Sequence, residues 1–317
     1  MTASPLVSIG VSAFNGERFL REALESLLAQ DYANLEIVVL DNQSVDGTQQ
    51  ICVELAARDR RLRLVVDDRR RNVMDGQRRA FELTTGEYFM IACDDDVYDP
   101  KYVSRLMERM TAEPALGVVY ASHAHIYPDG ERKPVATPRS FFFSSRTSPA
   151  RNFATYLRYR FPVPLVFGIV RADLHRKALP YFVRVDENGW DHDNLYVLRL
   201  LSLAPAMGIP EVLFYYRQRD RSAYIPRIEG GPLTHFYRKA LHQVAVSEMV
   251  SRIIAGGTFS PAERARLRAY NAWVCAVYCT HKYLTNTPLA ERVKRPLVRW
   301  RAGRAANRRA HYSVGGG

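Results

Sequence analysis

Three adjacent carboxylates are the residues of this 317-residue chain whose spacing points most directly to chemistry. Asp94, Asp95 and Asp96 follow the apolar run 88–93, which has the composition of a buried strand. Adjacent like charges disfavour each other's ionisation, and a divalent cation removes that conflict because oxygen ligands suit Mg²⁺ or Mn²⁺. The alternative is an acidic turn that caps the next helix, since Asp is favoured at turns and N-caps. The triplet alone leaves both interpretations open.

The elements that would position this triplet alternate regularly along the first hundred residues. Apolar spacing predicts strands at 6–14, 35–40, 62–66 and 88–93, separated by helices at 19–28, 48–58 and 74–84. Gly86 is expected to act as the C-cap of the third helix. Strands that alternate with helices predict an α/β fold with a parallel sheet.

Three of these predicted strands end in polar residues, at 13–15, at 41–42 and at the Asp triplet. Ligands in parallel sheets bind outside the carboxyl ends of the strands, so the three ends should converge on one crevice. Neither GxGxxG nor GxxxxGK[ST] follows the first strand. Their absence argues against a dinucleotide-binding fold and against a P-loop enzyme.

The rest of the chain is less regular. Its patterns predict strands at 117–121, 163–170 and 211–217, a hairpin turn at 128–130, and a helix at 191–203. A long loop is expected at 136–149, and only helices follow Tyr224, at 233–254, 261–284 and from 289 onward.

Composition and charge bound the function classes. Hydrophobic residues make up 47% of the chain, which suffices for a large core, and no apolar run approaches the roughly 20 residues of a membrane span. No signal-peptide pattern or CxxC pair is present, which favours a cytoplasmic location.

The net charge is +12, and eight basic and no acidic residues follow from Arg292. That segment predicts peripheral contact with the inner face of a membrane, against a solvated helix as the alternative. No zinc-finger or RNP-like spacing supports nucleic-acid binding.

Five stretches together resemble a known family. The stretches 7–16, 26–32, 41–48 and 85–88, and the Asp triplet followed by Pro100, are similar in order and spacing to the family 2 glycosyltransferases with a GT-A fold. The resemblance covers the chain to about residue 110 and resumes at 190–216. It implies a GT-A-type (Rossmann-like) mixed, mostly parallel sheet flanked by helices, here with a C-terminal helical extension.

The resemblance also implies a nucleotide-sugar donor, with UDP and dTDP as the candidates, and inversion at the anomeric carbon. It places Asp95 at a Mn²⁺ or Mg²⁺ ion that bridges the donor diphosphate, with Asp96 close by. The base would lie against residues 13–15 and donate to Asp41, and Asp94 would contact the ribose. The residues assigned to nucleotide binding in this way are Ala13, Phe14, Asn15, Glu17, Asp41, Arg78 and Asp94.

Two departures from the family pattern bear on the metal. Many relatives have Asp where this chain has Cys93, which leaves open which carboxylates touch the ion. Where relatives often carry His after a Tyr-Arg strand end, this chain has Arg219, and its guanidinium would contact the diphosphate directly.

Inverting transfer needs a general base that takes the proton of the acceptor hydroxyl. The family supplies it from an acidic pair at the start of a helix in the second half. Spacing to Arg199 aligns Asp193 with that base, with Asp191 as the alternative. The alternative to a catalytic role is that Asp191 or Asp193 only caps the start of the helix.

These assignments predict three parts: a donor-binding half at 1–115, an acceptor-binding half of the same domain at 116–225, and a basic helical region at 226–317. The acceptor is unknown, with a lipid-linked one among the options. Surface polysaccharide, glycolipid or glycosylated metabolite synthesis all fit. The oligomeric state is open, with a homodimer included.

A sugar-nucleotide pyrophosphorylase and a non-catalytic relative are the competing functions. The first should carry a Gly-rich basic loop after strand one, and retention of Asp41, Asp95 and Asp193 argues against the second.

Overall fold

A computed structural model of the protein describes residues 4–135, 142–159, 163–182, 192–218 and 232–286. Within these residues, nine strands form one mixed sheet in the order β3-β2-β1-β4-β8-β6-β9-β5, and β7 pairs with β6 off this path. The strands are β1 (Val7–Ala13), β2 (Leu35–Asp41), β3 (Leu62–Val66), β4 (Tyr88–Ala92), β5 (Val97–Tyr98), β6 (Val118–Ile126), β7 (Arg132–Pro134), β8 (Ile169–Arg171) and β9 (Ala206–Arg217).

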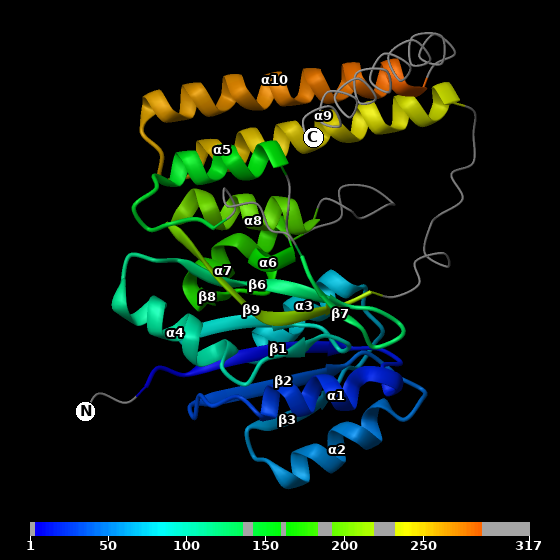
Figure 1. Ribbon diagram of the computed structural model, residues 1–317. Coiled ribbons are helices and arrows are strands. Elements are labelled where there is room, and N and C mark those ends of the chain that lie inside the picture. Colours follow the sequence, from blue (N-terminus) through cyan, green and yellow to red (C-terminus); the bar gives the residue numbers. More distant parts are fainter. Residues whose placement is uncertain (1–3, 136–141, 160–162, 183–191, 219–231, 287–317) are drawn as a thin grey trace, which may run out of the picture.

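Helices cover both faces of the sheet and stack further above one of them (Figure 1). Their bounds are α1 (Glu17–Leu28), α2 (Thr48–Arg58), α3 (Val73–Glu82), α4 (Tyr102–Ala112), α5 (Pro149–Tyr159), α6 (Val163–Val166), α7 (Ala172–Ala178), α8 (His192–Leu203), α9 (Pro232–Ala255) and α10 (Pro261–Asn286), with a 3₁₀ turn at Leu179–Tyr181. The predicted α/β sandwich with a helical C-terminal extension is confirmed.

The first four strands of the order, β3 to β4, are parallel, and their register aligns their carboxyl ends. Ala13 of β1 lies opposite Asp41 of β2, and Asp41 lies opposite Val66 of β3. Val11 pairs with Ala92 of β4, so β4 ends at the same edge. β1, β2 and β4 are mostly apolar and almost completely buried, as expected for parallel strands covered on both faces, whereas the edge strand β3 is partly exposed.

The two faces of β1 receive different helices. Ser12 faces α3, because a Cβ added to Gly76 would come into direct collision with the Ser12 hydroxyl. Side chains alternate along a strand, so Val7, Ile9 and Val11 point to the opposite face, where α1 and α2 lie (Figure 1). The apolar face of α1 (Leu20, Ala23, Leu24 and Leu27) is buried there.

Beyond β4 the strand direction reverses at β8 and is restored at β6 and β9. β8 pairs antiparallel with both β4 and β6, whereas β9 runs parallel to β6 with two register shifts between Ala121 and His123. β5 has only two residues and pairs antiparallel with β9, with Val97 opposite Tyr215. β5 follows the Asp triplet directly, so its pairing with β9 brings the end of β9 beside that triplet.

Two sequence predictions about elements are wrong. The stretch 163–170 forms the short helix α6 followed by β8 rather than one strand; Pro164 has no N–H for a sheet ladder, and Gly168 lies where a Cβ would approach Val119 O to 2.6 Å. Gly86 is not the C-cap of α3, which ends at Leu83. Its N–H donates to Ser8 Oγ at 2.8 Å, and a Cβ there would meet the backbone of β1 at 2.9 Å.

Helices α4, α5 and α7 were not among the predicted elements, whereas the hairpin turn before β7 is confirmed. Gly130 has a φ of 85° there, and its N–H donates to Tyr127 O at 2.9 Å. The strand predicted at 117–121 continues to Ile126.

The C-terminal region described by the structure is a pair of long helices. α9 and α10 lie side by side above α5 and α8 (Figure 1), and Asn271 of α10 donates to Ser247 O of α9 at 2.8 Å. None of the helices in the described ranges has both the length and the apolar character of a membrane span. The segment from residue 289 onward, with its basic residues from Arg292, lies outside the described residues.

Candidate active site

The loops after β1 and β2 are tied together by hydrogen bonds. Asn15 has a φ of 48°, its N–H donates to Ser44 Oγ at 3.0 Å, and its Oδ1 accepts from Val45 N at 3.0 Å. Glu17 Oε2 accepts from Gly47 N at 2.9 Å, so this carboxylate holds the start of α1 against the loop before α2. Two of the three polar strand ends therefore form one connected surface.

Asp41 closes the second of these loops from within. Its side chain is completely buried, both oxygens accept from Ser44 N at 3.2 and 3.3 Å, and Oδ2 also accepts from Gln49 Nε2 at 2.7 Å. A carboxylate that accepts several hydrogen bonds is a rigid support for its loop. An acceptor position on Oδ1 remains for a further donor such as a base.

The third strand end, the Asp triplet, lies against the first. A Cβ placed on Gly16 would lie 2.9 Å from Asp94 Oδ2, so the Asp94 carboxylate reaches the turn between β1 and α1. The predicted convergence of the three strand ends on one edge is what the described residues show.

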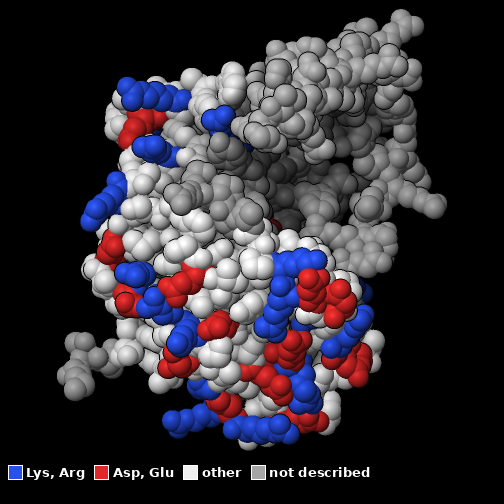
Figure 2. Space-filling view, viewed as in Figure 1, with Lys and Arg blue, Asp and Glu red and all other residues white. Residues whose placement is uncertain are grey.

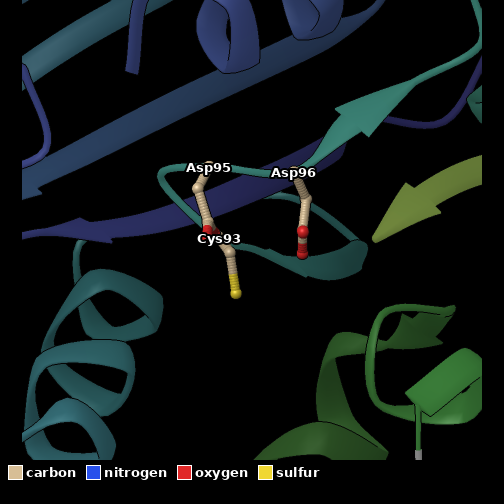
Figure 3. A group of neighbouring side chains, drawn as sticks. All are labelled: Cys93, Asp95 and Asp96. Atoms are coloured by element: carbon tan, nitrogen blue, oxygen red, sulfur yellow. The ribbon is translucent and has the colours of Figure 1, made fainter. Parts of the chain in front are cut away.

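Cys93, Asp95 and Asp96 form a compact group of ligand atoms at this edge. The sulfur and one oxygen of each carboxylate all lie within 4.8 Å of one another, and the three side chains leave the turn between β4 and β5 on the same side (Figure 3). Asp95 is 8% and Asp96 1% exposed, whereas Cys93 is half-buried. Buried carboxylates at this density are costly without a cation or protons.

The electrostatics of the group show this cost. Burial and the charge of Asp95 raise the pKa of Asp96 well above its ordinary range. Withdrawal of the sulfur from water, together with the charges of Asp96 and Asp95, raises the pKa of the Cys93 thiol well above its usual value. Asp96 Oδ2 is a buried atom without a hydrogen-bond partner among the described residues. The donor set therefore fits a divalent cation, which would compensate both the charge and the missing partner.

Arg217, the last residue of β9, holds the triplet from the other side. Its N–H donates to Asp96 Oδ1 at 2.8 Å, and its Nε donates to Asp95 O at 2.7 Å. The guanidinium also pairs with Glu22 of α1 at 2.5 Å and lies 4.4 Å from the centroid of the Phe19 ring. Sequence reasoning missed this residue and chose Arg219, two positions later, which lies outside the described residues.

A cavity of about 390 Å³ opens beside this arginine. It is bounded by the start of α1, the turn between β6 and β7, and the end of β9; its lining residues are Asn15, Gly16, Arg18, Phe19, Tyr127, Pro128, Arg217 and Gln218. The volume lies in the usual range of small-molecule sites. The cavity thus connects the first strand end with the arginine that supports the triplet.

Asp193 lies in the first turn of α8, and its charge acts on Cys93, the residue before the triplet. It is one of the carboxylates whose charge raises the pKa of the Cys93 thiol. Its neighbour Asn194 is anchored by the Tyr156 hydroxyl, which donates to Asn194 Oδ1 at 3.1 Å. Asp193 therefore lies within electrostatic reach of Cys93, while the alternative base, Asp191, lies outside the described residues.

The other predicted nucleotide contacts divide between two places. Phe14 lies beneath Arg70, whose guanidinium carbon is 4.0 Å from the ring centroid, and so remains at the rim of the β1 end. Arg78 lines a different, basic cavity of about 230 Å³ on α3, to which no residue of the triplet contributes. Gln77 of α3 comes closer, since its amide donates to Ala92 O at 3.3 Å, just before the triplet.

The face of the molecule seen in Figure 2 shows no large patch of one charge sign, among the described residues, that would indicate a second binding site. In Figure 2, the described Lys and Arg side chains are interspersed with Asp and Glu over the part of the molecule that carries α1 and α2. Exposed pairs such as Arg21 with Glu54, 2.6 Å apart, account for this mixing.

More than half of the chain matches one known protein family. The sequence pattern of the family described as "Glycosyl transferase family 2" matches residues 8–175, more than half of the chain. The chain belongs to glycosyl transferase family 2. The matched region includes β1 to β8 and the triplet but ends before Asp193 and Arg217.

Among curated relatives of this family 2 member, glycosyltransferase GlyG of Streptococcus pneumoniae serotype 4 is 26% identical over 127 residues, 40% of this chain and 42% of the relative. Glycosyltransferase GlyA of the same strain is 23% identical over 264 residues, which are 80% of this chain and 35% of GlyA. The chain thus spans less than half the length of these curated relatives.

Solved structures agree on the fold. S. aureus TarS 1–349 in complex with UDP-GlcNAc has a TM-score of 0.65 at 18% identity, covering 90% of this chain and 77% of TarS 1–349. The mannosyltransferase PcManGT from Pyrobaculum calidifontis, in complex with GDP-Man and Mn²⁺, has a TM-score of 0.56 at 20% identity, with 94% and 81% covered. The GT-A-type fold of this family 2 chain is thereby shown.

Proposed function

We propose that this protein transfers a sugar from a nucleoside-diphosphate sugar to an acceptor hydroxyl, with inversion and with a divalent cation at Asp95 and Asp96. The observation that carries the proposal is the buried Asp96 Oδ2, which has no partner in the described residues and lies next to the Asp95 carboxylate. Membership of family 2 and the sugar-nucleotide complexes of TarS and PcManGT support the same donor class.

The residues of the chain divide the chemistry between them. Asp95 and Asp96 would hold the divalent cation, which when bound offsets the negative charge of the departing diphosphate. Arg217 keeps the two carboxylates in place through its N–H and its Nε. Asp94 beside Gly16, and the loop braced by Asp41, form the edge at which the nucleoside would bind.

Asp193 is proposed as the general base. Its carboxylate would accept the proton of the acceptor hydroxyl as that oxygen bonds to the anomeric carbon and the bond from that carbon to the diphosphate oxygen breaks. A single displacement of this kind inverts the anomeric carbon. The acceptor is proposed as a carbohydrate or lipid-linked hydroxyl, with the protein in the cytoplasm and its basic segment from Arg292 on an anionic membrane face.

Calorimetry of the full chain with UDP, dTDP and GDP tests the donor site. We expect one of these nucleotides to bind in Mn²⁺ or Mg²⁺ and to lose most of its affinity in EDTA or in Asp95→Asn. Asp68→Asn, a matched change at an exposed carboxylate outside the site, should leave binding unchanged. Equal affinity with and without EDTA would refute the cation, and absence of binding by any of the nucleotides would refute the donor class.

Transfer itself is tested by incubating the protein with the sugar nucleotides of the bound base and following release of the nucleoside diphosphate. Slow hydrolysis without acceptor, abolished by Asp95→Asn, is the expected result. A protein that binds the nucleotide but never releases diphosphate, with any acceptor extract, would be a non-catalytic relative instead.

A further inference from the structure

The metal-binding group described above contains a sulfur atom as well as oxygens. Cys93 Sγ lies with one oxygen each of Asp95 and Asp96 inside a span of 4.8 Å, and all three side chains point to one side of the turn (Figure 3). Bonds from zinc to protein ligands of about 2.0–2.3 Å at tetrahedral angles set two ligand atoms roughly 3.3–3.8 Å apart, so side-chain rotations that draw the three atoms together by about 1 Å would complete the site.

A second observation shows that the group is built for a ligand. Asp96 is 1% exposed; its Oδ1 is used by Arg217 N, while Oδ2 has no hydrogen-bond partner in the described part of the chain. A buried acceptor without a partner costs about 1–3 kcal/mol, more when it is charged. The side chain is held in place by Arg217 and is directed into the same space as the sulfur.

Cys93 differs from a cysteine that only fills the core. Both Cys52 and Cys93 are free thiols, but Cys52 of α2 is fully buried in the core, as expected of a structural thiol, whereas Cys93 is half-buried and lies beside two carboxylates. Thiolate is a soft ligand that favours Zn²⁺ and related ions, while carboxylate oxygens alone favour Mg²⁺ and Mn²⁺.

We propose that Cys93 is a third protein ligand to the cation, so that the site is a mixed sulfur–oxygen site that selects Zn²⁺, Co²⁺ or Cd²⁺ over Mg²⁺. The proposal rests on the proposed function in that it concerns the same cation. On binding, the bond from Cys93 Sγ to hydrogen breaks, the proton passes to solvent, and the sulfur lone pair forms the bond to the ion. Three protein ligands leave a position for a diphosphate oxygen, as in catalytic zinc sites.

Titration of the metal-free full chain with Co²⁺ tests this directly, because a cobalt–thiolate bond gives a charge-transfer absorption in the near ultraviolet that oxygen ligands do not give. We expect the band in the wild type, its absence in Cys93→Ser, and its retention in Cys275→Ser, a matched change at the half-buried cysteine of α10. Cys93→Ala repeats the measurement without a hydroxyl that could itself bind.

Calorimetry with Zn²⁺, Mn²⁺ and Mg²⁺ on the same proteins measures the selectivity. Cys93→Ser should weaken Zn²⁺ roughly tenfold or more, which corresponds to about 1.4 kcal/mol, and should leave Mn²⁺ and Mg²⁺ nearly unchanged. Cys93→Asp should reverse the preference toward Mn²⁺ and Mg²⁺. Unfolding midpoints of all variants confirm that they are folded.

Two results overturn the proposal in different ways. If Co²⁺ binds with loss of affinity in Asp95→Asn but without a thiolate band, the site uses oxygens alone; the thiolate ligand is then excluded and the proposed function stands. If no divalent ion binds while UDP or another nucleotide does, both the thiolate ligand and the cation of the proposed function are excluded.

Discussion

The N–H of Arg217 donates a hydrogen bond of 2.8 Å to Asp96 Oδ1, although 121 residues separate the two along the chain. The same arginine holds Asp95 O through its Nε at 2.7 Å. The position of the acidic triplet therefore depends on the end of β9 as much as on β4.

Arg217→Gln should weaken divalent-ion binding and lower the free energy of unfolding by about 1–3 kcal/mol, because a largely buried donor to Asp95 O is lost. Glu22→Gln is the control: its carboxylate is half-exposed, so loss of the pair with Arg217 should change stability by less than about 1 kcal/mol. Urea unfolding and Mn²⁺ calorimetry measure both. Equal effects of the two variants would mean that the ion pair, not the bond to Asp95 O, is what Arg217 contributes.

Asp193→Asn should lower the rate of sugar transfer by on the order of 10²–10⁴-fold while the Kd for the donor nucleotide stays nearly constant, because only the proton acceptor is removed. Asp191→Asn is the matched change two residues earlier. Steady-state release of the nucleoside diphosphate is the readout. An inactive Asp191→Asn together with an active Asp193→Asn would move the base to Asp191.

His175 should make the protein less stable in acid. It is buried among Phe81, Phe89 and Tyr196, and burial lowers its pKa to about 3 from the ordinary 6.5. Between these values the unfolded chain binds the proton and the folded one does not, so stability is lost as pH falls below 6.5. This group alone should remove about 2 kcal/mol between pH 7 and pH 5.

His175→Phe separates this effect from other titrations. At pH 7 the variant should be about 1 kcal/mol less stable, because the bond of 2.6 Å between His175 Nδ1 and the Tyr196 hydroxyl is lost. At pH 5 the variant should be the more stable of the two proteins. Parallel stability curves of the two proteins over this range, from urea titrations, would show that His175 is accessible to protons in the folded state.

Gly86→Ala and Gly86→Asn should both destabilise the protein, by about 1–3 kcal/mol, since any Cβ meets the backbone of β1 at 2.9 Å. A C-cap glycine would behave differently, because Asn is tolerated in the left-handed conformation of such caps. Thermal unfolding of the pair distinguishes the two roles. A stable Gly86→Asn would restore the C-cap interpretation.

Local sequence patterns were enough to predict the strands, the helices and the polar strand ends of the first hundred residues. The alternation of strands and helices, and the rule that parallel strands present their carboxyl ends at one edge, placed Asp41 and the triplet correctly. Asn15 was placed in the same way. The hydrogen bonds from Asn15 to Ser44 and Val45 follow from that convergence.

Long-range pairing was the part that sequence could not supply. β5 is two residues long, and nothing local indicates that β9 pairs with it, so Arg217 was overlooked in favour of Arg219. Cys93 was identified from sequence only as a departure from the family pattern; its closeness to Asp95 and Asp96 appears only in the folded turn between β4 and β5. Arg78 was assigned from a stretch that follows the family pattern only loosely, and the structure places it beside a different cavity.

The position of β8 between β4 and β6 restricts how this protein can be shortened. A chain ending at residue 115 would keep every donor residue before it but would leave β4 without a neighbour on one side and β5 without β9. Unpaired strand edges recruit strands of other molecules, so such a fragment should aggregate rather than bind nucleotide. A fragment that keeps β4 and β5 paired must therefore carry the chain through Arg217.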